Sequence, residues 1–299
     1  MKSPLKKYRY LFAAPALIFF VCLAYSYYVE PHRLVVNAVD LKVKHLDPAF
    51  GGMKLVMISD IHGGSNAVDD AMIRRVVDLA NEQNADLIVL LGDYVSETNH
   101  AIPPNLKMPM AQVADDLAGL KAKYGVLAVL GNHDGWYCDQ CVRKELTRVG
   151  YTVLENEVAE IERNGKKLRF LGLPDHMKIR DWTSFSNAAK SALAPTDGQG
   201  DVIVLEHSPD VLPVITDKLL ISKDLKLILA AHTHGGQVWL PILGTPIVPS
   251  SYGQKYSYGH IRENGVDMFV TTGVGTSILP FRFMMPPEIA VVTLRVEND

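Results

Sequence analysis

The stretch VLAVLGNHD, residues 126–134, decides the fold class of this 299-residue chain. Its first five residues are aliphatic, and they run directly into Gly131-Asn132-His133-Asp134. A short continuous apolar run is typical of a strand that is buried on both faces. The polar residues behind it are turn formers that can also carry chemistry. The stretch therefore predicts an α/β protein with functional residues at the strand ends.

The same pattern recurs along the chain. Apolar runs occupy residues 55–58, 87–91, 126–130, 202–205 and 227–230, with closing strands predicted at 266–271 and 289–296. Helical spacing of apolar residues is found at 69–83 and 110–123. Asn164-Gly165 predicts a hairpin turn before a strand at 166–173. Residues 31–50 alternate apolar and polar side chains, which indicates an edge strand or an extended lead-in.

Five polar clusters each follow one of these apolar runs. They are Ser59-Asp60-Ile61-His62-Gly63, Gly92-Asp93-Tyr94, Gly131-Asn132-His133-Asp134, Glu206-His207-Ser208-Pro209 and His232-Thr233-His234-Gly235-Gly236. In open α/β sheets, functional sites lie just beyond the carboxyl ends of the strands. We therefore expect these distant segments to meet at one place.

The residue types in the clusters suit a metal ion. Five of the ten histidines lie there, together with aspartate and asparagine side chains. Carboxylate, imidazole and amide oxygen together are typical ligands of Mn, Fe or Zn. No cysteine is among them, so a structural thiolate zinc site is excluded.

In this order the clusters resemble those of the calcineurin-like metallophosphoesterase superfamily. The resemblance covers roughly residues 53–294 and is carried by Asp60-Ile-His62, Gly92-Asp93, Gly131-Asn132-His133-Asp134, His207 and His232-Thr-His234-Gly-Gly-Gln237. The tail from Gly275 to Arg282, followed by Pro287-Glu-Ile, is similar to the small membrane-associated bacterial branch, which acts on phosphomonoesters, phosphodiesters or lipid-linked nucleotides.

The resemblance implies a fold and a set of site residues. The fold would be a four-layer αββα sandwich formed by residues 53–299, after a basic segment at 1–9, an anchor at 10–29 and a lead-in at 30–52. One divalent ion would be held by Asp60, His62, Asp93 and His234. The other would be held by Asp93, Asn132, His207 and His232, with Asp93 as the bridge. His133 would be the histidine over the substrate that binds no metal.

Such a site implies hydrolysis of phosphate mono- or diesters. Two ions about 3.5–4 Å apart can hold the attacking and leaving oxygens, and metal-bound hydroxide would attack phosphorus. His133 would protonate the leaving oxygen. Asp134 either orients His133 or caps a turn. This predicts a metal-dependent phosphoesterase that uses two of Mn, Fe or Zn.

Two departures from the family pattern are visible. Ala231 stands where a glycine is usual before the His-x-His pair. The residues after Asp93 are Tyr-Val-Ser-Glu-Thr, not the Asp-Arg-Gly run of protein serine/threonine phosphatases. That run supplies an arginine for phosphate and an acid partner for the catalytic histidine, so a phosphoprotein phosphatase is disfavoured. Arg180 and Arg282 are either phosphate contacts or solvated surface residues.

The amino-terminal segment predicts a membrane anchor. Residues 10–29 contain no charged residue, and 20 residues at a helical rise of about 1.5 Å span the roughly 30 Å core of a bilayer. A cleaved signal peptide and a buried soluble helix remain as alternatives. The late apolar loop at residues 284–287 either covers an acyl chain or the bilayer surface, or packs in the core.

Charge favours one orientation of that anchor. The basic residues before the span are Lys2, Lys6, Lys7 and Arg9, and those just after it are mixed with acidic ones: Glu30, Arg33, Asp40, Lys42 and Lys44. The bias places the amino terminus in the cytoplasm of a bacterium and the phosphoesterase domain outside it. Without the first four basic residues the chain has 26 basic against 33 acidic residues, which makes a stable nucleic-acid partner a poor prediction.

Alternative readings remain for substrate and activity. A UDP-2,3-diacylglucosamine diphosphatase of lipid A synthesis would act on a cytoplasmic, lipid-linked nucleotide. A scaffold that binds phosphorylated ligands without turnover would have lost a metal ligand, and none is lost. A metallo-β-lactamase-type hydrolase is disfavoured because its His-x-His-x-Asp-His run is absent. Cys138 and Cys141, just after the Gly131-Asn132-His133-Asp134 loop, either form a disulfide that braces that loop or pack at the start of a helix.

Overall fold

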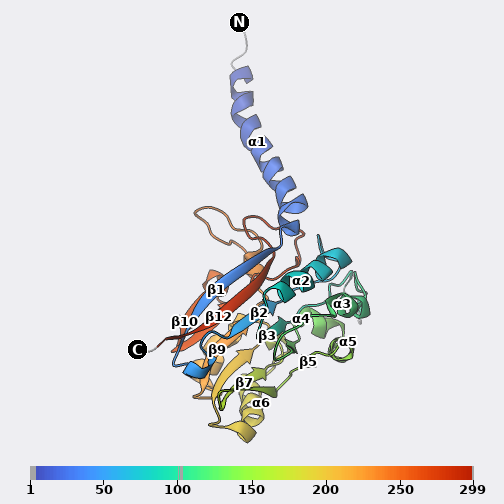
Figure 1. Ribbon diagram of the computed structural model, residues 1–299. Coiled ribbons are helices and arrows are strands. Elements are labelled where there is room, and N and C mark those ends of the chain that lie inside the picture. The colour runs from blue at the N-terminus through green and yellow to red at the C-terminus, as the bar shows by residue number, and fades with distance from the viewer. Residues whose placement is uncertain (1–4, 100, 102–103, 298–299) are drawn as a thin grey trace.

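The structure is a computed structural model that describes residues 5–99, 101 and 104–297. Residues 1–4 of the predicted basic segment lie outside these described residues. The chain begins with the long helix α1 (Leu5–Tyr28), which projects from the end of a layered α/β domain (Figure 1). The predicted boundaries between anchor, lead-in and domain stay a prediction.

Two six-stranded sheets form the domain. The first has the order β1-β12-β2-β3-β4-β5 and the second the order β10-β11-β9-β8-β7-β6. The strands of the first are β1 (Val35–Lys44), β2 (Lys54–Ile58), β3 (Leu87–Leu91), β4 (Val126–Val129), β5 (Thr152–Val153) and β12 (Glu288–Glu297). Those of the second are β6 (Glu157–Arg163), β7 (Lys166–Gly172), β8 (Asp201–Leu205), β9 (Leu225–Ala230), β10 (Gly259–Glu263) and β11 (Val266–Val270).

Helices cover the outer faces of both sheets. The helices beside the first sheet are α2 (Asp70–Glu82), α3 (Met110–Leu117), α4 (Asn132–Tyr137) and α5 (Asp139–Arg148), and α6 (Trp182–Leu193) lies beside the second. Apolar side chains of both sheets form one buried cluster between them, from Leu55 and Leu87 to Phe170 and Leu229. A second cluster joins the first sheet to α2 and α3, and a third joins the other sheet to α6. The predicted four-layer αββα sandwich is confirmed.

Most of the predicted elements appear close to their expected bounds. The apolar runs at 55–58, 87–91, 202–205 and 227–230 are strands with almost wholly buried side chains, as continuous runs predict. β1 is the edge strand expected between 31 and 50, and it pairs in parallel with β12. The helix expected at 110–123 ends at Leu117, because Ala118 adopts an extended ψ of 139° and Gly119 follows with a φ of 101°. The short edge strand β10, half-exposed and without a long apolar run, was not predicted.

The sheet topology gathers the strand ends at one edge. β2, β3 and β4 run parallel in the first sheet, and β8 and β9 run parallel in the second. The carboxyl ends of parallel neighbours point to the same edge of a sheet. Each of the five predicted polar clusters therefore begins where one of these strands stops.

Candidate metal centre

The backbone turns sharply after three of these strands, β2, β3 and β9. Five residues there adopt positive φ values of 46–70°: Asp60, His62, Asp93, His232 and His234. Residues other than glycine are uncommon in this left-handed region, although Asp and His tolerate it better than most. Strain of this kind collects at functional sites, where the surrounding structure holds it in place. It turns side chains of neighbouring strands toward one point.

Close backbone contact lets these turns fit together. Gly131 lies directly against the Asp93 side chain, and a Cβ atom added to Gly131 would overlap the Asp93 carboxylate. The backbone N–H groups of Asp93, Tyr94 and Gly131 all donate to the Asp134 carboxylate, at 2.8–2.9 Å. Asp134 therefore caps the turn and joins the ends of β3 and β4. Of its two predicted roles, the structure shows the capping one.

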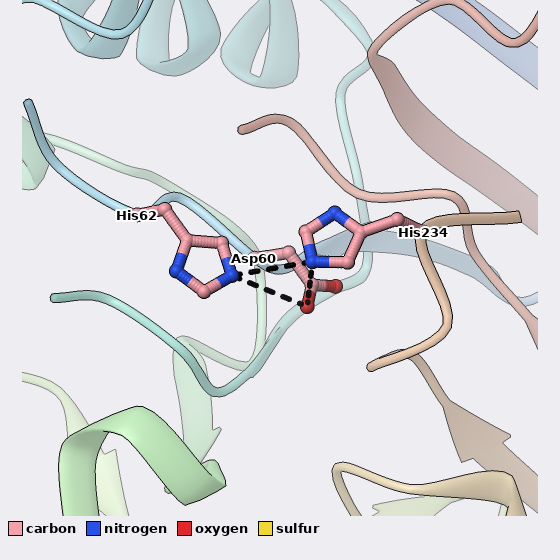
Figure 2. A group of neighbouring side chains, drawn as sticks. All are labelled: Asp60, His62 and His234. Atoms are coloured by element: carbon pink, nitrogen blue, oxygen red, sulfur yellow. Dashed lines mark hydrogen bonds and ion pairs between the residues drawn. The ribbon is translucent and has the colours of Figure 1, made fainter. Parts of the chain in front are cut away.

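The first group of candidate ligands is Asp60, His62 and His234. Their ligand atoms lie within 4.8 Å of one another, and all three side chains are buried (Figure 2). Asp60 Oδ1 is 3.4 Å from His234 Nε2 and 4.0 Å from His62 Nε2. The two imidazoles come from opposite sheets, and their Nε2 atoms face each other at 3.2 Å.

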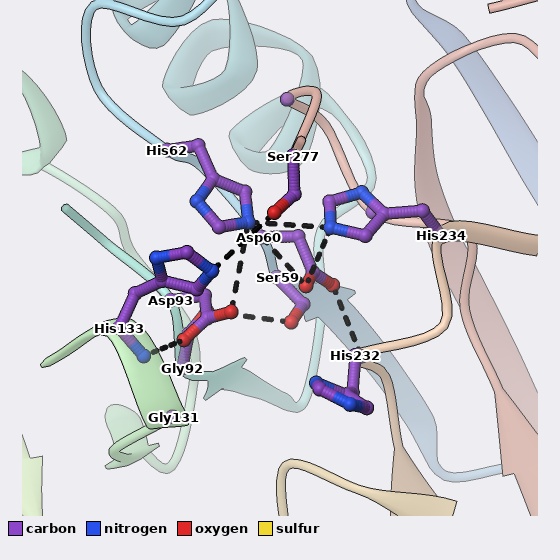
Figure 3. A network of polar contacts seen from close by, with 12 residues as sticks. Ser59, Asp60, His62, Gly92, Asp93, Gly131, His133, His232, His234 and Ser277 are labelled. Atoms are coloured by element: carbon purple, nitrogen blue, oxygen red, sulfur yellow. Dashed lines mark hydrogen bonds and ion pairs between the residues drawn. The ribbon is translucent and has the colours of Figure 1, made fainter. Parts of the chain in front are cut away.

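The second group is Asp93, His207 and His232, again within 4.8 Å of one another. Asp93 Oδ2 lies 3.2 Å from His207 Nε2 and 3.5 Å from His62 Nε2. Asp93 thus stands between the two groups, where a bridging carboxylate is expected. His232 Nδ1 faces His207 Nε2 at 3.1 Å. Figure 3 shows Asp60 and Asp93 at the middle of the network, with the histidines around them.

Hydrogen bonds to backbone carbonyls fix two of the imidazoles. His62 Nδ1 lies 3.2 Å from the Val95 carbonyl oxygen, and His207 Nδ1 lies 2.7 Å from that of Leu91. Because a carbonyl can only accept, each Nδ1 carries a proton, and Nε2 is the ring nitrogen that faces the Asp93 carboxylate. This is the arrangement by which proteins orient metal-binding histidines.

Burial keeps three of the imidazoles neutral. It lowers the pKa of His62 to about 3 and that of His232 to about 4. Burial, the neighbouring His62 and the Arg282 charge hold the pKa of His234 well below its usual range. A neutral imidazole is the form that binds metal.

Unpartnered atoms show that the residues fit divalent ions. Asp60 Oδ1 and Asn132 Oδ1 are buried, and neither has a hydrogen-bond partner within the described residues. Such groups are costly to bury unless something pairs with them. A cation between the facing imidazole nitrogens and the close carboxylates would likewise remove the repulsion among them. Asn132 begins α4, and the backbone N–H of the next residue, His133, donates to Asp93 Oδ1 at 2.9 Å.

His133 lies at the edge of the cluster and keeps 17% of its side chain exposed. Its Nδ1 is 2.5 Å from Glu97 Oε2, and its Nε2 is 3.3 Å from the Ser277 hydroxyl oxygen. The ring packs against Trp136 and His62 (Figure 3 shows His62). Burial lowers the pKa of His133, but the Asp93 and Glu97 carboxylates outweigh it and raise the pKa above its ordinary value. His133 can therefore carry a proton.

The Tyr-Val-Ser-Glu-Thr stretch after Asp93 contains an acid partner for His133, because a bend after β3 brings Glu97 to the ring. One prediction from the sequence is wrong. Arg282 is neither a phosphate contact nor a surface residue. It is fully buried, and it donates to the carbonyl oxygens of Gly275, Met285 and Thr272. Arg180 is exposed, as the surface alternative expects.

Further residues near the site escaped the sequence analysis. Ser277 was quoted only as part of the tail, and its contact with His133 depends on loop geometry. Two more groups have their ligand atoms within 4.8 Å of one another: His62, Asp93 and His133, and Asp175, His176 and Glu206. The latter group lies next to the second one through a contact of the His176 and His232 rings. The Pro-Asp-His sequence at 174–176, which follows β7, was the available signal. Cys138 and Cys141 form a disulfide at the start of α5, so the bracing alternative holds.

Two packed sheets with Asp and His side chains gathered at their strand ends define a metallophosphoesterase. The sequence profile described as calcineurin-like phosphoesterase matches residues 53–236, and the chain belongs to this family. The predicted resemblance is thereby confirmed, and the chain is a hydrolase of phosphate esters. The family depends on two metal ions, and the Asp/His groups described above are candidates to hold them.

Three relatives place the chain within the family. An uncharacterized metallophosphoesterase of Bacillus subtilis, YkuE, is 31% identical over 92% of this chain and 90% of its own length. Phosphodiesterase YaeI of Escherichia coli is 28% identical over 81% of this chain and 82% of its own. A transmembrane protein with metallophosphoesterase domain from Danio rerio is 27% identical over 89% of this chain, which spans 58% of that protein.

Proposed function

We propose that this chain hydrolyses phosphate mono- or diesters at a dinuclear centre, with His133 as the general acid. Asp60, His62, Asp93 and His234 would hold one ion, and Asp93, Asn132, His207 and His232 the other. The observation that carries the proposal is the position of Asp93 between His62 and His207, which come from opposite sheets. Divalent ions held there supply Lewis-acid activation of the ester and of water.

The protein's own groups have distinct tasks in this scheme. Glu97 holds the His133 ring through Nδ1, so that Nε2 points to the Ser277 side and toward the cluster. A proton on Nε2 is available to the leaving oxygen of the ester. The Val95 and Leu91 carbonyls keep His62 and His207 in the tautomer that binds metal. Carboxylate, imidazole and amide ligands favour Mn, Fe or Zn.

A metal-depletion experiment tests the proposal. Protein stripped with a chelator should be inactive toward p-nitrophenyl phosphate and bis(p-nitrophenyl) phosphate, and Mn should restore activity as two ions bind per chain. The ratio of the two rates assigns monoester or diester preference. Absence of any hydrolysis by protein that holds two ions would instead support the non-catalytic scaffold.

We propose that α1 anchors the chain in a bacterial cytoplasmic membrane by a single span. Residues Ala13–His32 are long and apolar enough for this, and 11% of the most apolar part of that segment is buried. The Danio rerio relative is named as a transmembrane protein. The basic residues before the span favour a domain outside the cytoplasm. The Cys138–Cys141 disulfide also suits an oxidising compartment.

Protease access in spheroplasts decides the orientation. External protease should digest the domain in intact spheroplasts. Full protection until lysis would place the domain in the cytoplasm, and would favour a UDP-2,3-diacylglucosamine diphosphatase, because UDP-linked lipids are made there.

A further inference from the structure

Two loops leave the metal centre and expose large apolar side chains. We name them the apolar loop pair, residues 238–247 and 277–284. Ile242, Leu243 and Ile247 are 103%, 63% and 69% exposed in the first loop. Ile278, Leu279 and Met284 are 93%, 43% and 51% exposed in the second. Scattered surface leucines are normal in soluble proteins, but a concentration of this kind marks a binding surface.

Three of these exposed residues also have a backbone conformation that is unfavourable for their residue type. Ile242 and Ile278 have φ values of 74° and 61°, and Met284 has 54°. Glycine or asparagine would occupy such turns without strain, whereas a β-branched residue is an outlier there. Ile242 and Ile278 therefore each destabilise the folded state in two ways, by a strained backbone and by an apolar side chain exposed to water. A partner that accepts apolar side chains would compensate both.

The two loops are hydrogen-bonded to each other and adjoin the metal centre. Gln237 Nε2 donates to the carbonyl oxygens of Ser277 and Leu279, and the Ser277 N–H donates to Gln237 Oε1. The Trp239 and Phe283 backbones are also hydrogen-bonded, at 2.9 Å. The first loop begins four residues after His234, and the second contains Ser277, which contacts His133. The surface thus borders the mouth of the site.

The carboxyl end of α1 contacts the second of these loops. The Arg282 N–H donates to the Ser26 carbonyl oxygen at 2.9 Å, and Asn66 Nδ2 joins the Tyr27 and Pro280 carbonyl oxygens. Tyr25 packs on Phe283 and Tyr27 on Phe281. Figure 1 shows the orange and red loops beside the carboxyl end of α1, at the end of the domain from which the helix projects.

We infer that the apolar loop pair rests in the lipid interface next to the anchor. The apolar loop pair lies next to the carboxyl end of α1, whose exposed side chains are also apolar. The partner we assign to the loop pair is therefore the bilayer that α1 would span. The site mouth then faces lipid headgroups, and the substrate class is a phosphate ester carried by an amphiphile in the membrane. This substrate class rests on the proposed phosphoesterase function, whereas membrane contact of the loops does not.

Fluorescence in bilayers tests the contact directly. The full chain with Cys22→Ser is reconstituted in phosphatidylcholine–phosphatidylglycerol nanodiscs, with NBD on a single added cysteine at position 242, 278 or 220. Leu220 is a matched control, because it is exposed apolar surface that precedes the amino end of β9, opposite the metal centre. NBD at 242 and 278 should be quenched by brominated acyl chains, and NBD at 220 should not. Equal quenching of NBD at all three positions would overturn the inference. The same holds if no position is quenched, which is the result expected when a second copy of the chain covers the loops.

Activity then tests the substrate class. The variant Ile242→Asp with Ile278→Asp should hydrolyse soluble bis(p-nitrophenyl) phosphate within twofold of wild type, but cleave a vesicle-embedded phospholipid analogue at least tenfold more slowly. Leu220→Asp should match wild type on both. Equal loss on both esters, or none on the lipid, would contradict the substrate class. A wild-type enzyme inactive on both would reject the proposed function, while the NBD result would still decide membrane contact.

Discussion

The strand ends and the loops around the metal centre hold their polar groups in different ways. Asp60, Asp93 and His207 directly follow paired strands, so the sheet register fixes them within a few residues. Glu97, Ser277 and Arg282 lie in irregular segments and are placed by contacts between loops far apart in the chain. The first set supplies the candidate ligands, and the second contacts those ligands and His133. We therefore predict that substitutions at the strand ends lower the reaction rate most, and that substitutions in the loops change it less.

Asp93→Asn should give the largest effect. An amide oxygen is a poorer ligand than a carboxylate, and Asp93 would serve both ions. We expect more metal to be lost than from any other ligand variant, with a rate loss beyond the roughly 10⁴-fold expected for a missing general acid. Metal analysis by mass spectrometry checks this. Wild-type metal content in this variant would reject the bridging role.

His133→Ala should come next and should separate catalysis from binding. The variant is expected to retain both ions and to lose about 10²–10⁴-fold in rate. His207→Ala and His232→Ala serve as the contrast, since they should weaken the second ion. If His133→Ala released metal as they do, His133 would be a ligand instead of an acid.

Glu97→Gln should have an intermediate effect. Glu97 raises the pKa of His133, so its loss should lower that pKa. Because the acid acts only when protonated, activity falls as pH rises through this pKa, and the falling limb should move to lower pH in the variant. We expect a loss of about 10–100-fold at neutral pH with both ions bound. An unshifted pH–rate profile would show that Glu97 does not act through His133.

Ser277→Ala should have the smallest effect. The hydroxyl makes one long contact with His133 Nε2, at 3.3 Å. Loss of such a contact changes the rate by about threefold, and metal content should stay at the wild-type value. A steady-state assay with the soluble diester is sufficient. A loss larger than that of His133→Ala would reverse the proposed ranking of strand ends over loops.

The same division explains how far the sequence could be interpreted. The strands and the meeting of the five polar clusters follow from apolar runs with polar residues behind them, whereas the four layers were implied only by the resemblance to the family. The roles of the seven candidate ligands and of His133 stay predictions. Glu97 was passed over because its position depends on a bend after β3 that no periodicity announces. Arg282 was misjudged because a buried arginine that donates to backbone carbonyls has no local pattern.

The pairing of β1 with β12 has a consequence for how the protein is made. β12 lies between β1 and β2 in the first sheet, yet it is the last of the described strands to be synthesised. Until residues 288–297 have emerged, β2 lacks its antiparallel neighbour and β1 has no partner to pair with. Contacts of such long sequence separation form slowly and leave strand edges open in the meantime. The first sheet therefore cannot be completed until residues 288–297 have been synthesised, and the need for chaperones should last until then.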